Sequence, residues 1–127
     1  RLKEPFFGYK GGITGKIKFG ETIFEAAERE MLEETGLHGE IFYHGIVHHI
    51  NYKEGLIVED KYLFAFSILN ASGELITQAE GLKNELMTVD EYRKCSPVYE
   101  GELDIVDMCI GKTDNHMIEV IHHLQDF

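Results

Sequence analysis

The stretch Gly15–Leu37, GKIKFGETIFEAAEREMLEETGL, decides the fold of this chain. It begins as a glycine-rich loop, and Thr22 then precedes Glu25 in the pattern of a capping box, which marks the start of a helix. Strong helix formers continue from Ala26 to Glu34, and Gly36 supplies the usual stop. The stretch therefore predicts a tight loop followed by a helix over Thr22–Thr35.

Three glutamates gather on this predicted helix. Glu30, Glu33 and Glu34 are spaced i, i+3 and i+4, which places them on one helix face. Each like-charged i,i+4 pair costs an isolated helix roughly 0.2–0.5 kcal/mol, and a hard divalent cation with oxygen ligands would offset that cost. The competing interpretation is a solvated acidic face, in which Arg29 pairs with Glu25 or Glu33 at the surface. The triplet alone does not decide between the two interpretations.

The spacing around the triplet does decide. Seven fixed residues occur at set intervals, with aliphatic Met31 and Leu37 between and after them: Gly15, Glu21, Arg29, Glu30, Glu33, Glu34 and Gly36. At roughly 7% frequency for each residue type, such a match arises by chance on the order of once in 10⁸ start positions. The pattern resembles the Nudix box at every defined position.

The resemblance implies a fold of the α/β (α+β) class, the Nudix fold, in which a mixed β-sheet is sandwiched between α-helices. Nudix domains carry a strand before the glycine-rich loop. Few residues precede Gly15, and the chain starts at Arg1 without an initiator Met, so we expect the N-terminal strand to be missing. With 127 residues, 43% of them hydrophobic, and no break in composition, residues 1–127 are expected to form a single domain.

Further elements are predicted from local patterns. Segments rich in aromatic and β-branched residues predict strands over Glu40–Ile50 and Lys61–Leu69, and a further strand is predicted at Glu74–Thr77. Turns are predicted at Lys53–Gly55 and Asn70–Gly73. Helices are predicted after a second capping box, Thr88–Glu91, and over Gly101–Ile110. The tail Asn115–Phe127 fits a helix or a strand equally well.

The resemblance also implies a metal site. It assigns four residues to a divalent metal, Mg²⁺ or Mn²⁺: Gly15 through its main-chain carbonyl, and Glu30, Glu33 and Glu34 through their carboxylates. Glu21 and Arg29 resemble the supporting pair of the family, which would tie the loop to the helix and orient the ligands. The competing interpretation of that pair is an ordinary surface salt bridge worth about 0–1 kcal/mol.

The implied reaction is hydrolysis of a pyrophosphate bond in a nucleoside diphosphate linked to another group. The metal would neutralise phosphate charge and lower the pKa of an attacking water. Glu30, Glu33 and Glu34 are the predicted catalytic residues, and Glu30 or Glu34 is the first choice of general base. Glu80 and Glu85 lie where the family often brings a further carboxylate towards the metal, although ordinary loop charges are an equally good interpretation.

Net charge limits the range of partners. The formal charge of −11 repels polyphosphates and nucleic acid, so a nucleic-acid platform is not expected, and a phosphate substrate requires a metal. The expected partner is a small-molecule nucleoside diphosphate derivative, and a homodimer is a further expectation. Cys95 and Cys109 are too few for a disulfide scaffold and not spaced for zinc, which favours the cytoplasm. No apolar run reaches the roughly 20 residues that span a bilayer, so no membrane partner is expected.

Other side chains invite binding hypotheses. His44, His48 and His49 lie close together, and a strand would place His44 and His48 on one face, but structural or surface roles are favoured over metal ligation. His122 and His123 carry less weight. Three aromatic residues near the glycine-rich loop are candidates for stacking on a base, although core positions are commoner: Phe6, Phe7 and Tyr9.

Two other function classes compete with hydrolysis. One is a non-catalytic Nudix-type domain that acts as a nucleotide-binding sensor or interaction module, and the other is a purely structural acidic domain. Sensors tend to lose box carboxylates, and every one of them is present here. Hydrolysis is therefore favoured, while the sequence does not name the substrate, because specificity depends on residues outside the box.

Overall fold

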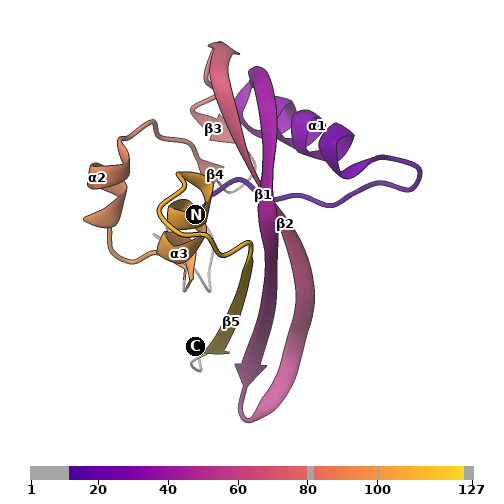
Figure 1. Cartoon of the computed structure of the whole chain (residues 1–127), viewed down its shortest axis with the longest axis vertical. Coiled ribbons are helices and arrows are strands. Elements are labelled where there is room, and N and C mark those ends of the chain that lie inside the picture. The colour runs from indigo at the N-terminus through magenta and orange to yellow at the C-terminus, as the bar shows by residue number, and fades with distance from the viewer. Residues whose placement is uncertain (1–11, 80–81, 100, 125–127) are drawn as a thin grey trace. The chain divides into compact units, whose positions relative to one another are not determined.

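The computed structural model describes residues 12–79, 82–99 and 101–124. Its elements, in chain order, are α1 (Ile23–Thr35), β1 (Leu37–Lys53), β2 (Leu56–Gly73), β3 (Gln78–Ala79), β4 (Leu82–Lys83), α2 (Val89–Arg93), α3 (Glu102–Cys109) and β5 (Met117–Leu124). One sheet has the strand order β2-β1-β5, and β3 pairs with β4 in a second, two-stranded sheet (Figure 1).

Helix α1 forms as the sequence predicts. The Thr22 hydroxyl accepts a hydrogen bond from the Glu25 amide at 3.1 Å, and the Glu25 carboxylate accepts one from the Thr22 amide at 3.1 Å. These two bonds are the complete capping box. At the other end, Gly36 adopts a left-handed conformation with φ of 75°, and its amide donates to the Leu32 carbonyl at 2.8 Å. The predicted helix and both of its caps are confirmed.

Strands β1 and β2 form a long hairpin around the predicted turn at Lys53–Gly55. Glu54 and Gly55 both have positive φ, at 53° and 76°, which matches the two-residue turns that suit the twist of a hairpin. Strands joined by such a turn are antiparallel. Both strands extend beyond their predicted ends on either side (Figure 1).

Two predictions between Asn70 and Thr77 are wrong. Asn70–Gly73 is the end of β2 and not a turn. Asn70 has a φ of 53°, which asparagine tolerates as a single residue, so the turn-forming residue is accommodated within the strand. Residues 74–77 do not form a strand, because the Ile76 amide donates to the Thr35 carbonyl of α1 at 2.8 Å instead of to a neighbouring strand.

The ambiguous tail forms strand β5. It pairs in parallel with β1, from Ile46 opposite Met117 to Lys53 opposite Leu124. Strand β1 therefore has an antiparallel neighbour on one side and a parallel neighbour on the other. The sheet is mixed and accompanied by helices, which confirms the predicted α+β class.

The chain divides into two compact units. The described residues of the first are 12–42, 67–79 and 82–99, and those of the second are 43–66 and 101–124. In the second unit, Met108 of α3 packs with Val47, Ala65 and Val120 in a buried cluster. Helix α3 thus covers one face of its strands, and it lies within the predicted range Gly101–Ile110. The expectation of a single domain stays a prediction.

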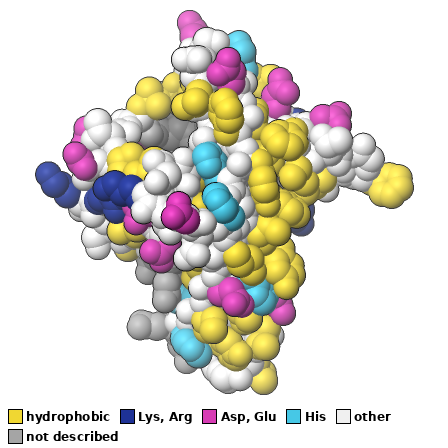
Figure 2. Space-filling view, viewed as in Figure 1, with side chains coloured by type: hydrophobic (Ala, Val, Ile, Leu, Met, Phe, Trp, Pro, Cys, Tyr) yellow, Lys and Arg dark blue, Asp and Glu magenta, His cyan; other side chains and the backbone are white. Residues whose placement is uncertain are grey.

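Hydrophobic side chains also remain at the surface of the strands. Figure 2 shows them gathered over β1 and β2, where Tyr43, Tyr62 and Phe64 are 41%, 62% and 39% exposed.

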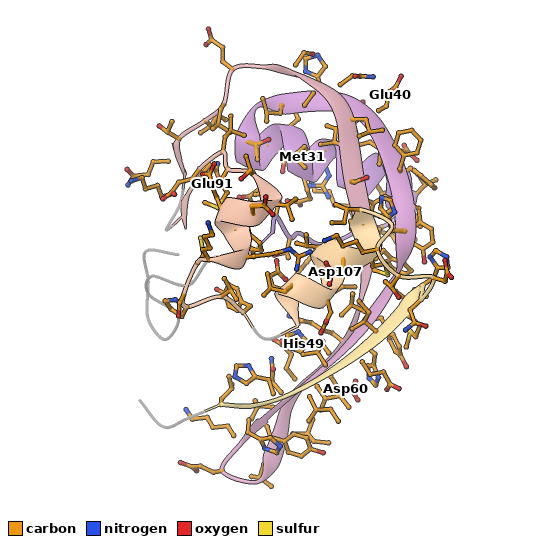
Figure 3. All side chains as sticks on the ribbon, turned by 60° about the vertical axis from the view of Figure 1, so that its left-hand side comes forward. Met31, Glu40, His49, Asp60, Glu91 and Asp107 are labelled. Carbon is orange, nitrogen blue, oxygen red and sulfur yellow. The ribbon has the colours of Figure 1, made fainter. Side chains whose placement is uncertain are left out.

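The predicted helix after Thr88 is α2, whose Thr88 hydroxyl accepts a hydrogen bond from the Glu91 amide at 3.1 Å. Figure 3 marks Glu91 on α2 and Asp107 on α3.

Candidate active site

The loop before α1 closes on itself just ahead of the helix. The Glu21 amide donates to the Lys18 carbonyl at 3.0 Å, and the Lys18 amide donates to the Glu21 carboxylate at 2.9 Å. Gly20 lies between them with a φ of 85°, a conformation that L side chains rarely adopt. This turn presents the Glu21 carboxylate to the helix that follows.

Arg29 joins that loop to α1. Its guanidinium forms a bidentate pair with the Glu21 carboxylate, in which Nε donates a hydrogen bond at 2.6 Å and a terminal nitrogen donates one at 2.9 Å. The same terminal nitrogen donates to the Lys16 carbonyl at 2.8 Å. Two-pronged arginine–carboxylate bonds are among the strong, geometrically specific ones. Hydrogen bonding to Arg29 lowers the pKa of Glu21 to about 2, so Glu21 is ionised throughout the ordinary pH range.

Arg29 also lies against two glutamates of the triplet. Its other terminal nitrogen donates to Oε1 of Glu30 at 2.6 Å and to Oε2 of Glu33 at 3.2 Å. The Glu30 side chain is 19% exposed and that of Glu33 is 56% exposed. The surface pairing considered from the sequence therefore occurs with Glu33, while Glu25 is engaged in the helix cap. One guanidinium faces three carboxylates, which leaves an excess of negative charge at this face of α1.

Gly15 packs directly against Glu30. A methyl group added at Gly15 would overlap the Cγ, Cδ and Oε2 atoms of the Glu30 side chain. The main chain of Gly15 thus lies beside the Oε2 edge of this carboxylate, while Oε1 faces Arg29. The absence of a side chain at Gly15 leaves room for the Glu30 carboxylate, and the close approach places a main-chain segment and a carboxylate side by side.

Glu34 is positioned through its main chain. Its carbonyl accepts a hydrogen bond from the Asn84 side-chain amide at 2.7 Å, and its own side chain is half-buried. The contact between Asn84 and Glu34 is not predicted from the sequence, because no local pattern links Asn84 to α1. Glu85, the next residue, is exposed, and Glu80 lies outside the described residues.

The residues present fit a divalent metal by donor chemistry. The helix offers carboxylate oxygens from Glu30, Glu33 and Glu34, and the main chain of Gly15 adjoins one of them, which suits the oxygen preference of Mg²⁺. Within the described ranges, no three His, Cys, Asp or Glu side chains are already gathered as a metal site.

The histidines occupy a different environment. Nε2 of His48 contacts Asp60 at 2.7 Å, and Nδ1 contacts Glu119 at 3.1 Å. The Tyr62 ring stacks on His48, with ring centroids 4.5 Å apart. His48 therefore links β1 to β2 and β5, as the structural interpretation of these histidines expects.

Two further expectations concern the C-terminal histidines and the aromatic residues near the N-terminus. His123 stacks on Tyr52, with ring centroids 5.0 Å apart, which is also a structural contact. The aromatic residues considered for base stacking, Phe6, Phe7 and Tyr9, lie outside the described residues.

In the part of the chain that the structure describes, no helix has the length and apolar character needed to cross a membrane.

Comparisons with known proteins agree with this fold. A family model described as NUDIX domain matches residues 3–108. A crystal structure described as a mutator MutT protein from Bacillus halodurans is similar, with a TM-score of 0.72 and 28% sequence identity. The match covers 98% of this chain and 80% of that chain.

The chain therefore belongs to the Nudix family, and it is a Nudix hydrolase. Enzymes of this family generally use divalent metal ions and act on small nucleotide derivatives.

Proposed function

We propose that this chain hydrolyses the pyrophosphate bond of a nucleoside diphosphate linked to another group, using Mg²⁺ or Mn²⁺. The observation that carries the proposal is the position of Glu30, whose carboxylate lies between the Arg29 guanidinium and the main chain of Gly15. The loop and the helix of the box thereby come together around one carboxylate. Glu33 and Glu34 follow on the same helix face as further ligands.

Each residue has a distinct role in the proposal. When bound, the metal neutralises phosphate charge and lowers the pKa of an attacking water. Glu30, Glu33 and Glu34 hold it through carboxylates, and Gly15 contributes its main-chain carbonyl. Arg29 holds the loop and the helix together, because it donates hydrogen bonds to Glu21 of the loop and to one oxygen each of Glu30 and Glu33. Orienting bonds of this kind tune ligands that contact the metal directly.

The general base is assigned to Glu30 or Glu34. Of the three glutamates, Glu34 is the one whose side chain has no hydrogen bond to Arg29 within the described residues. Glu85 follows Asn84, which contacts the end of α1, and is the alternative from outside the box. No covalent nucleophile is required, since positioning and electrostatic stabilisation suffice for this chemistry.

The acidic character of the chain agrees with this proposal. A net charge of −11 repels a phosphorylated substrate, and the local excess of carboxylates on α1 adds to the repulsion. A bound divalent cation reverses the sign of the field at the site. The proposed substrate is therefore a metal complex of a small nucleotide derivative. The free thiols of Cys95 and Cys109 support the cytoplasm as the place of action.

A hydrolysis screen tests this proposal. The protein is incubated with nucleoside triphosphates, nucleotide sugars, ADP-ribose and dinucleotides, each with Mg²⁺, with Mn²⁺, or with a chelator, and products are identified by mass spectrometry. We expect at least one substrate to be cleaved at its pyrophosphate bond only when metal is present. Cleavage that persists in chelator, or tight nucleotide binding with no turnover of any substrate, would contradict the proposal.

A further inference from the structure

The C-terminal end of α1 depends on groups from outside the helix. The last four carbonyls of an α-helix have no partner within it, and they must find donors elsewhere. In α1, the Leu32 carbonyl accepts from the Gly36 amide at 2.8 Å, as part of the local cap. The Thr35 carbonyl accepts from the Ile76 amide at 2.8 Å, and the Glu34 carbonyl accepts from the Asn84 side chain at 2.7 Å. Glu34 therefore has its main chain tied by a side chain fifty positions away.

Asn84 uses all of its donors at this point. An asparagine amide nitrogen carries two hydrogens. It donates to the Glu34 carbonyl and, also at 2.7 Å, to the Ile76 carbonyl. The Asn84 main-chain amide donates to the Thr77 carbonyl at 2.8 Å. Asn84 is thus hydrogen-bonded to the last turn of α1 and to Ile76 and Thr77, at the start of the segment leading to Asn84.

The Asn84 side chain contacts the part of α1 that carries two of the proposed metal ligands, so its loss would displace these ligands. The last turn of α1 carries Glu33 and Glu34, and the residue after Asn84 is Glu85. Because the bond from Asn84 is made to the main chain of Glu34, it fixes the start of that side chain without occupying its carboxylate. The same residue sets the main-chain position from which Glu85 extends.

We propose that Asn84 is a positioning residue that orients Glu34, and with it the metal-binding face of α1, for catalysis. This inference rests on the proposed function, because it assumes that the carboxylates of α1 hold the metal. Asn84 acts through the main chain of Glu34 and does not contact the metal or the substrate.

The helix end keeps other supports when the Asn84 side chain is removed. The bond from the Ile76 amide to the Thr35 carbonyl is between main-chain atoms. Gly36 and Gly73 also approach each other closely, since a methyl group at either would overlap a main-chain oxygen: Glu74 O for Gly36 and Gly36 O for Gly73. A variant at Asn84 therefore retains the docking of α1 and loses the bond at the turn that carries Glu34.

The experiment measures Mn²⁺ binding to the full chain without substrate, by electron paramagnetic resonance, together with kcat, KM and the melting temperature. Asn84→Ala removes both side-chain donors, and Asn84→Ser keeps one hydroxyl that is too short to bridge two carbonyls. We expect Mn²⁺ affinity and kcat to fall by about 10- to 100-fold in Asn84→Ala, the range found for groups that orient metal ligands, with a smaller change in KM. Asn84→Ser is expected to show a reduction in the same direction.

Ser72→Ala is the matched control. It removes a side-chain contact of 3.0 Å with His38 in the same unit, without touching α1, so it should leave Mn²⁺ affinity unchanged. A folded Asn84→Ala or Asn84→Ser variant that binds Mn²⁺ as the unaltered chain does would overturn the positioning role and leave the proposed function standing. If Asn84→Ala fails to fold, Asn84→Ser decides the question in the same way. If the unaltered chain binds no Mn²⁺, the proposed function itself fails.

Discussion

Arg29 and His48 are each held between carboxylates, but the two networks are built from different ranges of the sequence. Arg29 contacts glutamates eight, one and four positions away, all within the Nudix box. His48 contacts Asp60 and Glu119, twelve and seventy-one positions away on two other strands. The first network ties a loop to its own helix, and the second ties three strands together.

The two cations also differ in how permanent their charge is. The glutamates around Arg29 raise the pKa of a guanidinium that is already charged at every ordinary pH. Hydrogen bonds from the His48 ring to the Asp60 carboxylate, and then to that of Glu119, raise the pKa of His48 above its ordinary value, so this network can still lose its charge. The arginine network suits a catalytic site whose geometry must not change with pH, whereas the histidine network makes part of the stability of the sheet depend on pH.

The largest effect on kcat is expected when Arg29 loses its planar guanidinium group. Arg29→Lys keeps the charge but cannot contact Glu21 through two nitrogens while also reaching Glu30 and Glu33. We expect kcat to fall by about 10- to 100-fold, as is typical when groups that orient metal ligands are changed. Steady-state kinetics on the substrate found in the screen measure it, and Arg93→Lys on α2 is the control. An unchanged kcat in Arg29→Lys would show that charge alone is sufficient at this position.

Gly15→Ala separates the geometry of the site from the stability of the fold. The added methyl group overlaps the Glu30 side chain, which can move aside because it is flexible. We therefore expect Glu30 to be displaced, with a loss of about 10-fold in activity or metal affinity, the lower end of the range for disturbed ligand geometry. The melting temperature should change little. A large loss of stability with full specific activity in the folded fraction would indicate that Gly15 serves only the loop.

Thr22→Ala should affect the helix but not the carboxylate network. It removes the side-chain acceptor for the Glu25 amide, and the loss of such a cap costs about 1 kcal/mol. Urea unfolding of the variant and of the unaltered chain measures the difference in the free energy of unfolding. Because the bond that is lost joins a hydroxyl to a main-chain amide, neither of which titrates in this range, we expect this difference to be the same at pH 6 and pH 8, within roughly a few tenths of a kcal/mol. A strong pH dependence would mean that the cap and the carboxylates are coupled.

The smallest effect is expected at His48, and it should depend on pH. A histidine whose pKa is higher in the folded than in the unfolded chain adds stability below its unfolded pKa and loses it as the pH rises through the folded value. His48→Gln should therefore be less stable than the unaltered chain at pH 5, and the difference should shrink above the folded pKa. Chemical unfolding at a series of pH values tests this. A difference that stays constant or grows with pH would contradict the charged pairing with Asp60 and Glu119.

The sequence predicts the parts of this molecule that are local. The capping box at Thr22, the stop at Gly36 and the hairpin turn at Glu54 and Gly55 depend on residues within a few positions of each other, and all three are confirmed. The pairing of Glu21 with Arg29 also follows a fixed spacing, and the structure contains it. The assignment of the glutamates to a metal remains a prediction.

Contacts between distant segments are the parts that the sequence does not predict. The bond from Asn84 to α1, the pairing of β5 with β1 and the His48 network join residues that lie far apart along the chain. The wrong turn at Asn70–Gly73 has the same origin, because pairing within the hairpin holds turn-forming residues in a strand. Local propensity is a weak prior that such tertiary contacts override.

The central claim is that the carboxylates of α1 hold the metal that drives hydrolysis. The most direct measurement compares metal-dependent kcat for Glu33→Gln and Glu34→Gln with that for Glu28→Gln, the same change at an exposed position of the same helix that is not one of the fixed residues of the box. The account predicts that both box variants lose most of their activity while remaining folded, and that Glu28→Gln keeps it. Full activity in Glu33→Gln and Glu34→Gln would contradict the account.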